Sequence, residues 1–94
     1  MGIAKKGTRN IDIEETAYRW VVSLDSDFMV LVVELSNNPG QRLEAQFEYK
    51  NKSGEETVIS PALVKNVIIG ALSEGWEPEI LGLAPFRVSG AKYE

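Results

Sequence analysis

One segment of this chain carries both a helix start and a helix stop, and it constrains the fold more than any other feature. It opens with Ser60-Pro61: a serine hydroxyl accepts a hydrogen bond from an unpaired amide at a helix N-cap, and proline suits the first helical position. It closes with Gly75-Trp76, because glycine adopts the left-handed conformation that often ends a helix. Apolar residues recur between them at three- and four-residue spacing. We therefore expect one amphipathic helix over residues 61–74, in which Gly70 indicates a close backbone approach to the sheet.

The rest of the chain is typical of strands joined by tight turns. Strand-like segments cover residues 10–14, 18–24, 28–35, 42–49, 55–59 and 86–88. The connections between the first strands are too short for crossover helices, so consecutive strands are expected to pair antiparallel. The sequence predicts an α+β fold: an antiparallel β-meander of four to five strands, one C-terminal α-helix on one face, and a short final strand. The helix should pack against Leu43, Ala45 and Phe47 and one side of the strands before them.

The length of 94 residues predicts a single domain over residues 1–94, with flexible ends at 1–7 and 90–94. The longest purely apolar run, Met29–Val33, is far shorter than the roughly 20 residues of a membrane span. Residues 1–10 lack the apolar stretch of a secretory signal. We therefore expect no membrane partner and a cytoplasmic location.

Two absent residue types limit the chemistry. The chain has no cysteine and no histidine, which excludes thiolate nucleophiles, the commonest general base and the commonest transition-metal ligand. The formal net charge of −4 disfavours nucleic acid, which requires a basic patch. Asp25 and Asp27 flank Ser26 and are interpreted as turn formers rather than an acid–base or calcium pair. The sequence thus predicts no catalytic, cofactor-binding or metal-binding residue and no cofactor.

The strand over residues 28–35 is apolar on both faces, whereas one helix covers only one face of a sheet. Phe28, Val30 and Val32 share one face, and the other carries Met29, Leu31, Val33 and Leu35. Three covers for the second face remain open: the C-terminal segment 81–88, a second copy of the chain, or a small ligand. Val21 and Trp20 would extend such a patch. The predicted interaction surface comprises Val21, Phe28, Val30 and Val32.

The second half of the chain carries a recognisable set of motifs. They are Ile59-Ser60-Pro61, Gly75-Trp76-Glu77-Pro78 and Pro85-Phe86-Arg87-Val88. This part resembles the tails of small bacterial proteins of unassigned function, with a Ser/Thr-Pro helix start, a Gly-Trp-x-Pro exit and a closing Pro-Phe strand. The resemblance implies no activity and no functional residues.

Two functions of different classes follow from these patterns. The first is a small non-enzymatic protein-interaction module of unknown partner, homodimeric through a sheet face. The second is a small-molecule-binding domain or metal-independent enzyme with a carboxylate-lined cleft that contains Asp25, Asp27 or Arg19. The two-sided apolar strand favours the first.

Overall fold

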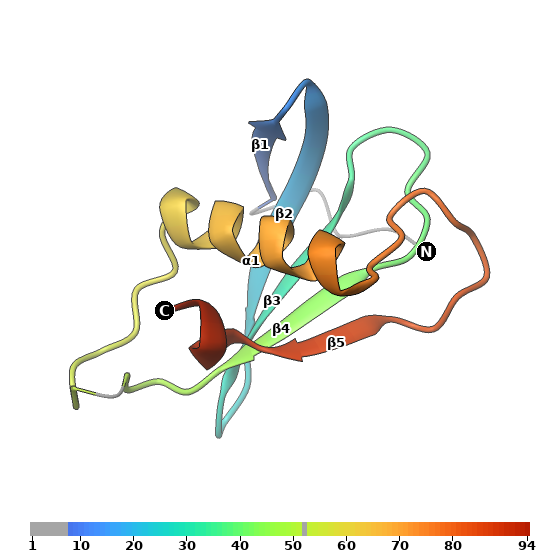
Figure 1. Cartoon of the computed structure of the whole chain (residues 1–94). Coiled ribbons are helices and arrows are strands. Elements are labelled where there is room, and N and C mark those ends of the chain that lie inside the picture. The colour runs from blue at the N-terminus through green and yellow to red at the C-terminus, as the bar shows by residue number, and fades with distance from the viewer. Residues whose placement is uncertain (1–7, 52) are drawn as a thin grey trace.

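The computed structural model of the chain describes residues 8–51 and 53–94. Within these residues, one five-stranded sheet carries a single α-helix across one face and a short 3-10 helix at the C-terminal end (Figure 1). The elements are β1 (Arg9–Ile13), β2 (Thr16–Leu24), β3 (Met29–Leu35), β4 (Leu43–Phe47), α1 (Pro61–Glu74), β5 (Phe86–Ser89) and η1 (Gly90–Tyr93). Their order in the sheet is β1-β2-β3-β4-β5, and the first four pair antiparallel. The predicted α+β class is confirmed.

The predicted helix is confirmed together with both of its ends. The Oγ atom of Ser60 accepts a hydrogen bond from the Leu63 amide at 3.2 Å, and Pro61 occupies the first turn. Gly75 has φ 115° at the other end, and the Trp76 amide donates back to the Ala71 carbonyl at 2.9 Å. This six-to-one bond is typical of the Schellman motif, which pairs carbonyl groups that the helix end leaves open.

Two details of the sheet differ from the prediction. Residues 55–59 do not add a strand, since only an isolated bridge from Lys50 to Glu56 forms there and Val58 is exposed. β5 instead pairs parallel to β4, from Leu43 opposite Phe86 to Gln46 opposite Ser89. A parallel pair needs a long crossover connection, and α1 supplies it.

The core lies between α1 and one face of the sheet. The strand register places Tyr18 opposite Leu35, Trp20 opposite Val33, and Leu31 opposite Ala45. The buried residues are Ile13, Tyr18, Trp20, Met29, Leu31, Val33, Leu43, Ala45, Phe47, Val64, Val67, Ile68, Ala71 and Trp76. Trp20 is therefore a core residue, and the prediction that it extends the opposite patch is wrong. The pleat requires this result, because Trp20 and Val21 point to opposite faces.

The C-terminal end packs on the helix. Residues 90–94, expected to be flexible, form η1 and its cap, and the Tyr93 ring lies against Gly70. The Tyr93 hydroxyl donates to Glu74 at 2.9 Å, and the Lys92 ammonium lies 2.6 Å from the same carboxylate. We had expected Gly70 to allow a close approach to the sheet. It accommodates the Tyr93 ring instead. The predicted flexible segment 1–7 lies outside the described residues.

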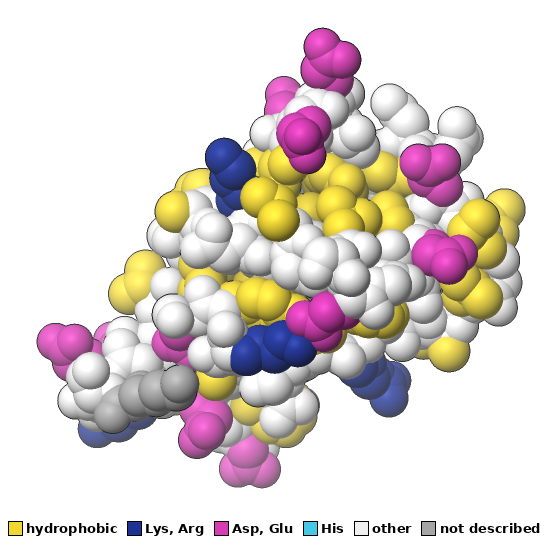
Figure 2. Space-filling model, in the orientation of Figure 1, with side chains coloured by type: hydrophobic (Ala, Val, Ile, Leu, Met, Phe, Trp, Pro, Cys, Tyr) yellow, Lys and Arg dark blue, Asp and Glu magenta, His cyan; other side chains and the backbone are white. Residues whose placement is uncertain are grey.

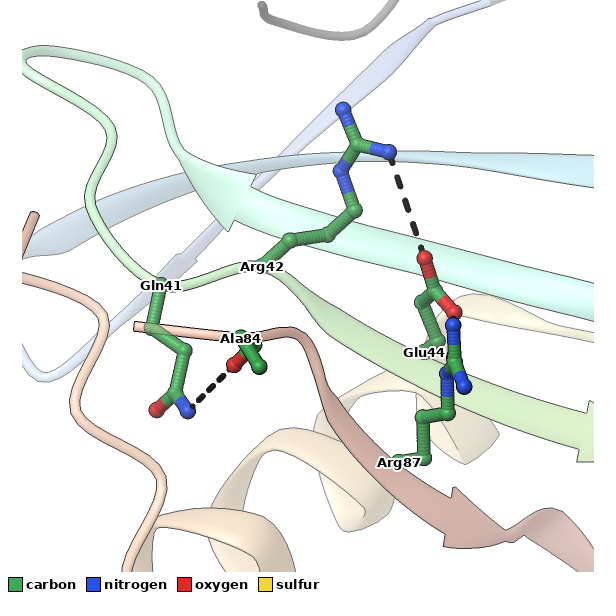
Figure 3. A network of polar contacts seen from close by, with 5 residues as sticks. All are labelled: Gln41, Arg42, Glu44, Ala84 and Arg87. Carbon is green, nitrogen blue, oxygen red and sulfur yellow. Dashed lines mark hydrogen bonds and ion pairs between the residues drawn. The ribbon is translucent and has the colours of Figure 1, made fainter. Parts of the chain in front are cut away.

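Gln41 joins three segments just before β4. Its carbonyl accepts from the Trp76 indole at 3.0 Å, and its side-chain oxygen accepts from the Glu77 amide at 2.8 Å. Its side-chain nitrogen donates to the Ala84 carbonyl at 2.9 Å (Figure 3). These bonds fix the loop that leads from α1 to β5. The Gly-Trp-x-Pro sequence accordingly has a structural role, with Trp76 and Pro78 both buried.

Within residues 8–51 and 53–94, no helix combines the length and the apolar character that crossing a bilayer requires.

Candidate functional site

The four residues of the predicted interaction surface lie together on the side of the sheet opposite α1. Val21 pairs directly with Val32 across β2 and β3, and Val30 follows two residues along the same face. Phe28 precedes β3 and shares a shallow hollow with Val30. All four are partly exposed. We call this surface, defined by Val21, Phe28, Val30 and Val32, the valine face.

Charged side chains of both signs border the valine face. On one side the Arg19 Nε atom donates to Glu34 at 2.7 Å, and Glu34 is only 3% exposed. On the other side Glu44 lies between two arginines: its carboxylate is 3.9 Å from Arg42 and accepts from the Arg87 Nε atom at 3.1 Å (Figure 3). These five residues form two groups of ion pairs beside the apolar centre. We call them the rim.

The residues of the rim come from four strands, and they were not predicted from the sequence as one group. The register puts Val32 opposite Glu44 and Glu44 opposite Arg87, so β5 completes a row that begins at Val21. Alternation along residues 42–49 does place Arg42 and Glu44 on the face away from Leu43. Arg87 was not recognisable, because its position depends on the parallel pairing of β5 with β4.

The C-terminal segment does not form the cover that we had considered for this face. Phe86 and Val88 pair with Leu43 and Ala45 and pack against the core, so β5 widens the sheet. Leu81 and Leu83 are 78% and 46% exposed. A second copy of the chain and a small ligand remain as occupants.

The hollows beside the valine face are not shaped like a ligand site. The hollow that Phe28 and Val30 share with Glu44 and Arg87 has a volume of about 240 Å³. Pockets for drug-sized ligands usually measure about 300–1,000 Å³. A larger hollow of about 470 Å³ lies at the ends of β4 and β5, where Lys50, Glu94 and their neighbours line it. The hollow that touches the valine face is thus smaller than a usual ligand pocket, and the larger hollow is lined by none of the four residues of that face.

The residues of the alternative, enzymatic hypothesis are not brought together. Asp25 and Asp27 are exposed in the turn between β2 and β3, where the Asp25 carboxylate accepts from the Ser26 amide at 2.7 Å. The Asp25 amide donates to the Phe28 carbonyl at 2.9 Å, which closes the turn. Arg19 lies six residues earlier along β2, about 20 Å away at the usual rise of a strand. The interpretation of the aspartates as turn formers agrees with this geometry.

No group of three or more Asp or Glu side chains with the spacing of a metal site occurs in the part of the chain that the structure describes. Comparisons of the chain with protein-family models, with curated proteins and with solved structures found no match. The geometry of the valine face and its rim is therefore the basis for assigning a function.

Proposed function

We propose that this protein is a non-enzymatic interaction module whose partner is a second copy of itself, joined face to face through the valine face. The observation that supports this most is the continuous apolar patch of Val21, Phe28, Val30 and Val32 on the side of the sheet opposite α1. Central strands that are apolar on both sides usually have cover on both sides. A second copy supplies that cover without any further protein.

The symmetry of the patch favours a second copy over an unrelated partner. In a two-fold dimer the same surface meets itself, so it must be self-complementary. Val21 and Val32 are direct neighbours. A two-fold axis between them would place each valine of one copy opposite either Val21 or Val32 of the other copy. The rim holds three arginines and two glutamates, so it carries both signs of charge, as a self-complementary surface requires.

The size of the surface sets the expected affinity. The whole side of the sheet that carries the valine face, with five strands about 4.8 Å apart and about seven residues rising about 3.3 Å each, measures roughly 500 Å². A standard interface buries about 800 Å² on each partner. We therefore expect a reversible dimer with a dissociation constant in the micromolar range rather than an obligate one. The net charge of −4 supports a protein partner over nucleic acid.

Sedimentation velocity over a micromolar to millimolar concentration series tests the proposal. The wild-type weight-average mass should rise from that of a 10.4 kDa monomer toward twice that value. Val32→Thr keeps the β-branched shape and should weaken the dimer about fivefold or more, and Val21→Arg should abolish it. Val58→Thr, at a position 74% exposed outside the valine face, is the matched control.

A folded Val32→Thr variant that associates like wild type would contradict the proposal. So would a wild-type protein that stays monomeric at millimolar concentration. A urea melt of each variant separates loss of association from loss of folding.

A further inference from the structure

A second apolar surface lies on the helix side of the molecule. A groove of about 290 Å³ runs between the C-terminal half of α1, the start of β2, the end of β3 and the loop that follows the helix. Its uncharged lining consists of Thr16, Tyr18, Leu35, Leu72, Pro78 and Ile80. Figure 2 shows hydrophobic side chains gathered between α1 and the β1–β2 hairpin, with several acidic side chains around them and one basic side chain at the left end. We call this surface the acidic groove.

The acidic groove has a rigid floor and exposed walls. Tyr18 is 4% exposed and packs on Trp76 with ring centroids 5.8 Å apart. Pro78 beside it is buried. On the walls Leu72 is 37% exposed and Ile80 is 45% exposed. Ile69, three residues before Leu72 on the same flank of α1, is 45% exposed and extends the apolar wall.

Carboxylates border this groove from two sides. Glu77 and Glu79 line it from the loop after α1. Glu14 belongs to the two-residue turn between β1 and β2, which leads into Thr16. Burial, and then the charges of Glu79 and Glu14, raise the pKa of Tyr18, so both carboxylates act on the ring that forms the floor. An apolar floor between like charges is suited to a ligand that is both apolar and cationic.

We propose that the acidic groove binds a short peptide segment of a partner protein, in which an apolar side chain is flanked by lysine or arginine. The volume of about 290 Å³ lies below the usual range for drug-sized ligands but holds one or two large side chains of a peptide. Groove-to-groove contact between two copies is disfavoured because their acidic borders would face each other. This proposal uses the face opposite the valine face and does not depend on the dimer.

A peptide titration followed by ¹H–¹⁵N correlation spectra tests the proposal. The probe is a short synthetic peptide with leucine and tryptophan among lysines, and its twin carries glutamate in place of every lysine. The lysine peptide should shift the amide signals of Thr16, Leu72 and Ile80, and the glutamate twin should not. High salt should weaken the binding, because exposed charges are screened beyond about one Debye length.

Two substitutions and one control locate the site. Glu79→Lys and Ile80→Ser should each weaken binding of the lysine peptide about fivefold or more, measured by fluorescence anisotropy. Glu55→Lys makes the same charge change at an exposed position outside the groove and should change the affinity less than about twofold. Both groove positions are exposed, so the variants are expected to fold, and their spectra report this directly.

Four outcomes would overturn the proposal. The first is that the amide signals of the groove residues do not shift at millimolar concentrations of the lysine peptide. The second is equal binding of the glutamate twin. The third is unchanged affinity in a folded Glu79→Lys variant. Groove shifts that appear on concentrating the protein without peptide would identify a second copy as the occupant and would likewise overturn it. Monomeric behaviour of the wild type would leave this proposal intact, which keeps it distinguishable from the dimer.

Discussion

The ring of Tyr93 occupies the space where a side chain at Gly70 would stand. A β-carbon built at Gly70 would overlap the Cε1 atom of the tyrosine and would lie 2.9 Å from Cδ1. The tyrosine hydroxyl reaches one turn further along α1 and donates to Glu74 at 2.9 Å. Gly70 therefore leaves room for the Tyr93 ring, which allows η1 to pack on α1.

Gly70→Ala should destabilise the protein, although alanine is the better helix former by about 1 kcal/mol. Overpacking against the Tyr93 ring costs about 1–3 kcal/mol, so we expect a net loss of about 1 kcal/mol in a urea melt. In a Tyr93→Ala background the same substitution should be neutral or stabilising, since the clash is gone. Stabilisation by Gly70→Ala in the otherwise wild-type chain would show that Tyr93 does not pack there.

The Glu74, Lys92 and Tyr93 group predicts a stability difference that depends on pH. The hydrogen bond from Lys92, and then that from Tyr93, lowers the pKa of Glu74 below its ordinary 4.5. A carboxyl with a lowered folded-state pKa stabilises fully above 4.5 and loses that contribution as the pH falls through the folded value. The difference in unfolding free energy between wild type and Glu74→Gln should therefore shrink below pH 4.5.

Lys92 and Tyr93 of the same group give a stability contribution that is lost at high pH rather than at low pH. The hydrogen bond to Glu74 raises the pKa of Lys92 above 10.5. Burial, and after it the hydrogen bond to Glu74, raises the pKa of Tyr93 above 10.0. The contributions of Lys92 and Tyr93 to stability are complete below their ordinary pKa values. They are lost as the pH rises through the raised pKa values of the folded state. Urea melts of wild type and Glu74→Gln across this range test both limbs, with Glu55→Gln as the exposed control. A difference that does not vary with pH would contradict the arrangement.

Gln41→Ala should destabilise the protein by about 2–3 kcal/mol. The substitution removes two side-chain hydrogen bonds and leaves the Glu77 amide and the Ala84 carbonyl without the partner that Gln41 supplies. Gln46→Ala, at an exposed glutamine on β4, should cost less than about 0.5 kcal/mol. Equal effects of the two substitutions in a denaturant melt would show that the Gln41 bonds contribute nothing specific.

The turn between β1 and β2 offers a stabilising substitution. Glu14 and Glu15 have φ values of 48° and 68°, and Ile13 pairs with Thr16, so this is a two-residue hairpin turn with two left-handed positions. Such turns favour Asn-Gly, and non-glycine residues cost about 1 kcal/mol each there. Glu14→Asn with Glu15→Gly should therefore raise the unfolding free energy by about 1 kcal/mol. A lower denaturation midpoint would contradict this turn geometry.

The sequence made the helix and the two faces of β3 predictable because each rests on local chemistry. Ser60, Pro61 and Gly75 act on their own neighbouring backbone groups, and the period of two along residues 28–35 assigns every side chain to a face. Three of the four residues of the valine face, Phe28, Val30 and Val32, follow from that period, whereas Val21 comes from β2.

The remaining features depend on contacts between distant parts of the chain. Nothing local to Phe86–Ser89 indicates that β5 pairs parallel with β4, and Arg87 joins the rim only through that pairing. Glu14-Glu15 lacks the residues that usually signal a tight turn, so strand pairing imposes the conformation on it. The acidic groove combines α1, the hairpin and the loop after the helix, which no window of the sequence brings together.

The most direct test of the central claim is an isotope-filtered NOE experiment on an equal mixture of ¹³C-labelled and unlabelled protein at millimolar concentration. Contacts between methyl groups of different molecules should arise from Val21, Val30 and Val32, because the proposed dimer brings these side chains together across its two-fold axis. Intermolecular contacts confined to residues of α1, or none at all in a sample that sediments as a 10.4 kDa monomer, would contradict self-association through the valine face.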